Sequence, residues 1–366
     1  MLAIVEFLGL VGYEVLVAYA MKAFCSMQQK RKVIYLFWAL FPLALMTMFH
    51  GESIGNDTRT YTDLFDLVRN MTLAQVLSDR GFEKGYMLFT YILTRISSTR
   101  QSVLIAEGMI VYLSFARWLS KWSKAPGMVV CLIVEMLVID GWMSVLRQAL
   151  AMAVLFLAFD ALVEKRLLRF CILVVLAAQF HAYPMLWWIK EPREGQLKKN
   201  WIYEKIMVAG AIGIALLLQP VLKLLLELFP KYQYYISGVY MDGQARVAII
   251  LKIIILGLML IVPLWVSGIG NRSNQNTCDL ALYRMSIANI VLLVAANQAT
   301  ILTRISDVFL IYAIMYSSEH VSRLQYGKNR KLLTAAILIL FALYGVIATI
   351  YRTPSWQTTY PFEWWT

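Results

Sequence analysis

Long apolar segments separated by short polar ones dominate the hydrophobic pattern of the chain. Residues 3–21 form the first apolar segment and residues 33–49 the second. Segments of this length can cross a bilayer as helices. Because basic residues gather in the cytoplasmic loops of membrane proteins, we predict that residues 3–21 are a signal anchor with its N-terminus outside. Four basic residues separate the two segments: Lys22, Lys30, Arg31 and Lys32.

The same pattern predicts further membrane segments along the chain. Simple crossings are expected at residues 102–118, 127–145, 147–165, 202–219, 247–266, 280–299, 301–318 and 332–350. A single crossing at 169–189 would place the basic residues around Lys198 outside, against the inside bias. We therefore predict a broken or re-entrant pair there that turns at Phe180–Pro184. The expected fold is an all-α, polytopic integral membrane protein, a single domain over 1–366 with about 11 membrane segments.

Two polar regions, residues 50–101 and 220–246, are predicted to be outer loops. Within the first, residues 85–97 have the pattern of a short amphipathic helix at the membrane interface. The stretch that begins at His50 contains Gly51 and Gly55, followed by Asn56 and Asp57. These residue types favour a defined turn, which would present Asp57, Thr58 and Tyr61.

Composition and charge exclude two classes of protein. Hydrophobic residues make up 60% of the chain and charged residues 15%, and the mean hydropathy is +0.64. This composition is not that of a soluble globular domain. The net charge of +12 would suit nucleic acid binding in a soluble protein. Here the basic residues lie in short loops between spans, so the expected partner is the lipid bilayer and not nucleic acid.

Several ionisable residues lie in or near the apolar segments, where each costs about 2.5–3.5 kcal/mol on insertion scales. Taken singly, each has an ordinary explanation. An arginine can snorkel to the interface, and residues spaced i,i+3 on a helix can neutralise one another. Together they bring acids, an imidazole and guanidinium groups to one side of the membrane, which favours a functional site. The residues in or near apolar segments are Arg147, His181, Arg304 and Asp307. All of these except Asp307 lie close to the outer side, where Asp57 and Glu83 join them.

Five short motifs follow one another along the chain. They are Gly55-Asn-Asp57-Thr58-x-x-Tyr61-x-x-x-Phe65, Glu83-x-Gly85-Tyr86, Arg147-Gln148-x-Leu-Ala151, Ala178-x-Phe180-His181, and finally Arg304. In this order they resemble the bacterial EpsG/Wzy-like polysaccharide polymerases over roughly residues 45–310. The chain departs from that pattern twice. An arginine that often precedes the first motif is absent, with His50 near its place, and Ala182-Tyr183-Pro184 replaces the usual small, hydroxyl-bearing residue.

The resemblance implies a GT-C-like glycosyltransferase architecture and an enzyme that joins oligosaccharide repeat units carried on undecaprenyl diphosphate. The reaction is expected at the periplasmic face of the bacterial inner membrane. The implied partners are undecaprenyl-diphosphate-linked glycans, with a chain-length regulator as an optional further partner, and no cofactor is implied. The outer loops contain no Asp-x-Asp pair, so we expect a metal-independent mechanism in which arginines stabilise the leaving diphosphate.

The predicted site follows from these motifs. Arg147 and Arg304 are expected to stabilise the diphosphate, and either Asp57 or His181 to act as general base. Six further residues are expected to bind substrate: His50, Thr58, Tyr61, Glu83, Tyr86 and Gln148. Two other functions remain open, a transporter or flippase of lipid-linked sugars and a membrane acyltransferase. The three hypotheses differ in product: polymerised chains, translocated units or acylated substrate.

Overall fold

The computed structural model describes residues 1–79, 81–182, 209–210, 213, 246–266, 277–296, 302–324, 327–352 and 359–366. All regular secondary structure in these ranges is helical, which confirms the predicted all-α class. The chain divides into two compact units, and each is described by itself below. Unit 1 comprises Met1–Trp188 and Val321–Thr366, and unit 2 comprises Ile189–His320.

Six described helices are long and apolar enough to cross a membrane: α1 (Leu2–Ala20), α2 (Gln29–Phe49), α6 (Ser102–Trp122), α9 (Leu146–Val163), α14 (Thr277–Ala296) and α16 (Lys328–Arg352). A bent pair, α7 (Pro126–Glu135) with α8 (Val138–Ser144), would make a seventh span. All of them lie where the hydrophobic pattern predicts a crossing. The described residues therefore support a multi-pass membrane protein, whereas the expected count of about 11 segments is not confirmed.

The bend between α7 and α8 is a feature that the sequence analysis did not anticipate. The two helices meet at 62°, where residues 127–145 were expected to form one crossing. Leu137 lies at the break with φ of 56°, in the left-handed region. A side chain disfavours this conformation, which cannot continue a right-handed helix. Helix α7 consequently stops at Glu135, and the short helix α8 runs from Val138 to Ser144, directly before α9.

Large aromatic side chains form the core of unit 1. α6 packs between α2 and α9, α10 (Leu167–Ala178) packs on α9, and α1, α7 and α16 pack together. Trp118 of α6 stacks on Phe156 of α9 with ring centroids 5.1 Å apart. Trp142 of α8 is buried in this core, with its ring centroid 5.3 Å from that of Phe115. Trp142 is therefore a packing residue of the core.

The loops at one end of unit 1 are joined to one another by hydrogen bonds. The amide of Gly127 donates to the carbonyl of Ala23 at 3.0 Å, and the amide of Met27 donates to the carbonyl of Lys124 at 3.0 Å. Arg330, at the start of α16, donates to the carbonyl of Phe24. The basic loops that flank α2, α7 and α16 thus share one end, as the alternation of crossings predicts.

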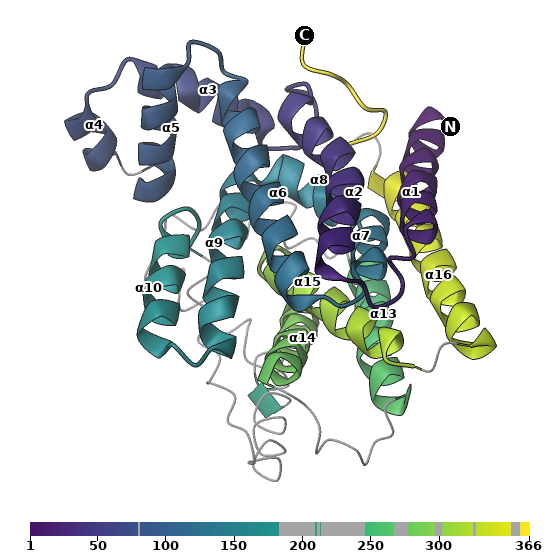
Figure 1. Ribbon diagram of the computed structural model, residues 1–366. Coiled ribbons are helices and arrows are strands. Elements are labelled where there is room, and N and C mark those ends of the chain that lie inside the picture. Colours follow the sequence, from purple (N-terminus) through teal and green to yellow (C-terminus); the bar gives the residue numbers. More distant parts are fainter. Residues whose placement is uncertain are drawn as a thin grey trace. The chain divides into compact units, whose positions relative to one another are not determined.

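The opposite end of unit 1 carries a helical cap. The predicted outer loop 50–101 contains α3 (Thr58–Arg69), α4 (Leu73–Ser78) and α5 (Lys84–Ile96), which Figure 1 shows gathered near the start of α6. Helix α5 confirms the amphipathic helix expected at 85–97, whereas α3 and α4 were not predicted. α3 packs on α5 through a buried face at helical spacing, and α4 begins with a capping box formed by Thr72 and Gln75. We call residues 58–96 the α3–α5 cap.

Unit 2 contains the described helices α13 (Arg246–Val266), α14 and α15 (Leu302–Ser322). Asp307 of α15 forms an ion pair with Lys252 of α13. Asn289 of α14 is fully buried, and its amide donates to the carbonyl oxygen of Ser306 at 2.6 Å. Polar contacts of this kind hold helices together inside a membrane. The part of the re-entrant pair beyond Ala182 lies outside the described residues, and so does the expected outer loop 220–246 except for Arg246, the first residue of α13.

Candidate active site

The loop that leads into α3 is fastened to the end of α8. Gly55 has φ of +78°, and a side-chain carbon placed on it would lie 2.7 Å from the Cα atom of Ser144. Only glycine fits this close approach. The amide of Asn56 donates to the hydroxyl of Ser144 at 3.0 Å, and the hydroxyl of Thr58 lies 3.1 Å from the carbonyl oxygen of Met143. The start of α3 is thereby held next to the start of α9.

Arg147, the second residue of α9, is held by the α3–α5 cap. Its Nη1 atom forms an ion pair with Glu83, and its Nε atom donates to the hydroxyl of Tyr61 at 3.4 Å. The guanidinium carbon lies 4.8 Å from the ring centroid of Phe82. The side chains of Arg147 and Glu83 are each 22% exposed. The structure thus holds a partly exposed cation between a carboxylate and aromatic faces, where a cation–π contact adds to the ion pair.

The electrostatics of this place favour an anion. A positive side chain at a helix N-terminus opposes the helix dipole, so Arg147 needs a partner there. Glu83 supplies one as the N-cap residue of α5, and Asp57 is the N-cap residue of α3. The starts of α3, α5 and α9 come together, and the first amides of each helix lack acceptors within the helix. The guanidinium of Arg147 beside these helix starts forms a suitable binding place for a phosphate group.

Tyr61 and Tyr86 form a buried pair beneath Arg147. Tyr61 is 1% exposed and Tyr86 is fully buried, and their rings meet edge to face with centroids 5.4 Å apart. Burial raises the pKa of Tyr86 well above its ordinary value, so its phenol stays protonated. Tyr86, predicted to bind substrate, lies behind Tyr61 and supports it.

The end of α10 packs against the start of α5. The amide of Tyr86 donates to the carbonyl of Gln179 at 3.2 Å, and a side-chain carbon on Gly85 would lie 2.7 Å from the Cβ atom of Gln179. Phe180 contacts Phe89 of α5 with ring centroids 6.5 Å apart. His181 follows directly and is buried. The predicted histidine therefore lies beside the cap.

The structure brings most of the predicted site residues together. Asp57, Thr58, Tyr61, Glu83, Tyr86, Arg147, Gln148 and His181 lie at the starts of α3, α5 and α9 or just after α10. His50 is fully buried after α2, where it forms an isolated bridge with Trp364, and burial lowers its pKa. Arg304 belongs to α15 in unit 2, so its role beside Arg147 stays a prediction.

Comparison with known families decides the identity of the chain. The sequence matches the model of the EpsG family over residues 33–364, nearly the whole chain. The chain belongs to the EpsG family. The predicted family is thus confirmed, and the family is one of Wzy-like polysaccharide polymerases. No curated protein and no solved structure matches the chain.

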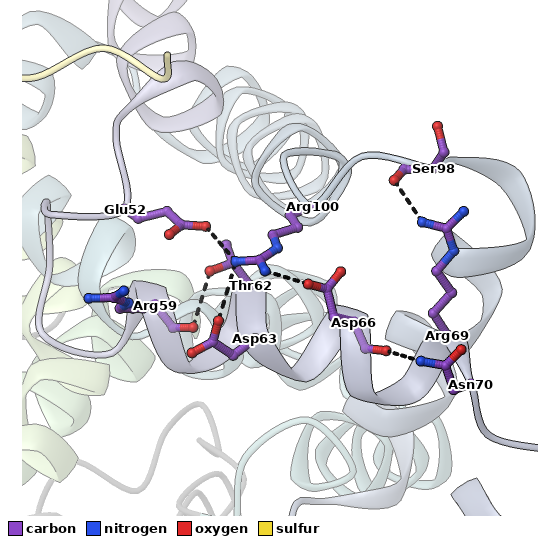
Figure 2. Close-up of polar contacts among 9 residues, drawn as sticks. All are labelled: Glu52, Arg59, Thr62, Asp63, Asp66, Arg69, Asn70, Ser98 and Arg100. Carbon is purple, nitrogen blue, oxygen red and sulfur yellow. Dashed lines mark hydrogen bonds and ion pairs between the residues drawn. The ribbon is translucent and has the colours of Figure 1, made fainter.

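Two features of this EpsG-family site were not found from the sequence. Phe82 has no charge or motif to mark it, although it directly precedes Glu83 and its ring lies against Arg147. Arg100 forms ion pairs with Glu52 at 3.4 Å, Asp63 at 3.3 Å and Asp66 at 2.5 Å. Figure 2 shows this arginine between the three carboxylates. The ion pairs connect Arg100, just before α6, with the loop that carries Glu52 and with α3. The spacing of Asp63 and Asp66 on one face of α3 was the available signal.

Possible metal ligands are dispersed in the described part of the EpsG-family chain. No group of three or more His, Cys, Asp or Glu side chains there is arranged to hold a metal ion. The three carboxylates of Figure 2 surround the guanidinium of Arg100 instead. Metal independence stays a prediction, and the arginine of the site is the group available for charge stabilisation.

Proposed function

We propose that this EpsG-family chain joins undecaprenyl-diphosphate-linked repeat units into a surface polysaccharide at the periplasmic face of the bacterial inner membrane. The observation that carries the proposal is Arg147 at the converging starts of α3, α5 and α9. Its Nη2 atom has no hydrogen bond among the described residues, and the side chain is 22% exposed. A guanidinium with a spare donor edge suits bidentate binding of a diphosphate.

In the proposed reaction, a hydroxyl oxygen of the acceptor glycan attacks the anomeric carbon of the donor. The bond from that carbon to the diphosphate oxygen breaks, and the diphosphate leaves with the electron pair. Arg147 stabilises the negative charge that develops on this oxygen, a preorganised contact worth about 3–4 kcal/mol in comparable sites. Arg304 is proposed as a second cation on the same diphosphate. The hydroxyl proton passes to Asp57 or His181.

Glu83 has two tasks in this scheme. In the described state it pairs with Arg147 and offsets the unfavourable position of a cation at a helix start. The incoming diphosphate then competes for the same guanidinium, and the released carboxylate can accept hydrogen bonds from sugar hydroxyls. Gln148 follows Arg147 on α9 and is proposed to orient the sugars, whereas the buried Tyr61 holds the guanidinium in place.

The two candidate bases can be separated with azide, an anionic nucleophile that carries no proton. A variant that lacks the base, either Asp57→Asn or His181→Gln, should transfer its donor glycan to azide and release a glycosyl azide. Variants that lack the diphosphate contact should not be rescued, because the leaving group remains unstabilised. Rescue of one variant alone identifies the base.

The proposal is tested with purified protein in vesicles that contain a lipid-diphosphate-linked repeat unit. We expect a ladder of glycan chains on the lipid, absent with Arg147→Ala and unchanged by a chelator of divalent cations. Chain growth that stops with chelator and returns with magnesium would contradict metal independence. Movement of the unit across the bilayer without chain growth would support the transporter, and acylated product would support the acyltransferase.

A further inference from the structure

The last described segment of the chain, residues 359–366, returns to the loop that leads into the site. We call it the C-terminal strap. The amide of Gly51 donates to the carbonyl of Glu363 at 2.7 Å, and the amide of Trp365 donates to the carbonyl of Phe49 at 2.7 Å. This pattern is a short antiparallel bridge centred on His50 and Trp364. The strap therefore pairs with the backbone next to the site loop.

Side chains reinforce this backbone pairing. The hydroxyl of Ser53 donates to the carboxylate of Glu363. The amide of Phe362 donates to Oε2 of Glu6 at 2.7 Å, and Tyr360 is buried against Phe7 of α1 with ring centroids 5.8 Å apart. The strap is thus bonded both to α1 and to the site loop.

The end of the strap reaches the buried cluster beneath the site. Trp365 packs against a buried cluster that residues of the cap form together with residues of α6 and α9, and Tyr61 belongs to this cluster. The neighbouring Trp364 is 57% exposed. Tyr61 is the residue whose hydroxyl accepts from Arg147. The strap consequently touches the packing that supports the guanidinium.

These contacts give the site loop two anchors. The strap holds Gly51 and Ser53 at one end, and α8 holds Asn56 and Thr58 at the other. Each ordered backbone residue costs about 1–2 kcal/mol of conformational entropy, so a loop held at one end only would lose order. Asp57 lies within this loop, and a misplacement on the order of 1 Å can cost about 100-fold in rate.

We propose that the C-terminal strap is a positioning element of the active site, which stays docked during turnover and holds residues 50–58 in place. It keeps the start of α3, with Asp57 and Tyr61, beside Arg147. The catalytic part of this inference rests on the proposed function, whereas the hold on the loop does not. Residues of the strap act through the loop and do not touch the reacting atoms.

Two neighbouring tryptophans provide a matched test. Trp365→Ala removes the ring that packs on the buried cluster, and Trp364→Ala removes an exposed ring from the same strap. For Trp365→Ala we expect faster hydrogen exchange of the amides of residues 50–58. We also expect about a tenfold lower kcat per inserted molecule with an unchanged KM. The melting temperature should fall, because the ring leaves the buried cluster, and it is measured separately from the rate. Trp364→Ala should behave as the parent does.

Three outcomes decide the proposal. Unchanged hydrogen exchange of the loop in Trp365→Ala would overturn the hold of the strap. Faster exchange with a normal kcat would overturn its positioning role. A parent that polymerises nothing, while the loop of Trp365→Ala exchanges faster, would reject the proposed function and establish that the strap holds the loop.

A reversible cross-link tests whether the strap stays docked. Ser53→Cys and Glu363→Cys are combined in a chain whose four native cysteines are replaced, and the pair is joined by a short, reducible bifunctional reagent. A docked strap predicts that cross-linking leaves kcat unchanged or raises it, and that reduction returns the starting value. Loss of activity on cross-linking with recovery on reduction would show that the strap must leave, which would overturn the proposal.

Discussion

Helix α9 carries an ionic cluster at each end, and the two clusters differ in how completely their central charge is paired. Near its last turn, Asp160 is 2% exposed and accepts from Arg117, from Lys121 at 3.3 Å and from Nε1 of Trp122 at 2.6 Å. Near its first turn, Arg147 is 22% exposed, and Glu83 is its one carboxylate partner among the residues that the structure describes. The charge of Asp160 is therefore fully paired, whereas the guanidinium of Arg147 keeps donors that no described residue accepts.

Both charges oppose the dipole of α9, because an acid is disfavoured at a helix C-terminus and a cation at an N-terminus. Each therefore depends on tertiary partners. A buried carboxylate surrounded by donors is a structural link between α6 and α9. A partly exposed guanidinium with an open edge can take a ligand without breaking the fold. The number of partners, more than the presence of a charge, separates the structural cluster from the candidate site.

The largest expected effect comes from Arg147→Lys. Lysine keeps the charge but lacks the planar fork that binds a diphosphate at two oxygens. We expect polymerisation per inserted molecule to fall about 100- to 1,000-fold, almost as far as in Arg147→Ala, with normal amounts of protein. Rate and abundance are measured separately in vesicles. Normal specific activity of Arg147→Lys would contradict a bidentate contact with the diphosphate. Normal activity of Arg147→Ala would show that Arg147 does not belong to the site.

Asp160→Asn tests the structural cluster near the last turn of α9. The amide cannot satisfy the three donors that converge on the carboxylate, so the folded state should lose about 1–3 kcal/mol. Less inserted protein and a lower melting temperature are expected, with a normal rate for each molecule that remains folded. A lower rate per folded molecule at parental stability would mean that this cluster also belongs to the site.

Glu83→Gln tests whether Glu83 competes with the diphosphate for the guanidinium of Arg147. The substitution keeps the shape and removes the negative charge that competes with the diphosphate for Arg147. We expect undecaprenyl diphosphate, the released carrier, to bind about tenfold more tightly, which corresponds to about 1.4 kcal/mol. Product inhibition measured for parent and variant gives the comparison. Weaker binding in the variant would show that Glu83 orients Arg147 for the diphosphate more than it competes with it.

The smallest expected effect is on the pH dependence of stability, through His50, which pairs with Trp364 of the strap. Burial lowers the pKa of His50 from its ordinary value of 6.5. Because the folded state binds this proton less readily than the unfolded state, the stabilising contribution is complete above pH 6.5 and is lost as the pH falls below it. Thermal stability of His50→Gln should therefore decline less steeply on acidification than that of the parent. Parallel declines in the two proteins would exclude His50 as the titrating group.

Local sequence patterns were sufficient to predict several of the membrane spans and to recognise the family from the order of its motifs. The hydrophobic runs located α1, α2, α6, α9 and α16. Whether a segment crosses the membrane depends on its own length, hydrophobicity and flanking charges, which the local sequence contains. The motif order identified the family and placed Arg147, Glu83 and His181 among the candidates. The amphipathic pattern also located α5 within the polar region.

Contacts between residues distant in sequence decided the rest. The break at Leu137, the ring of Phe82 on Arg147 and the carboxylates around Arg100 depend on which helices meet. The pairing of Glu363 with Ser53 joins residues 310 positions apart. Hydropathy records the preference of each segment for lipid, whereas an ion pair or a backbone bridge depends on the geometry of both partners. The open guanidinium of Arg147 therefore became recognisable only once the helices that surround it were in place.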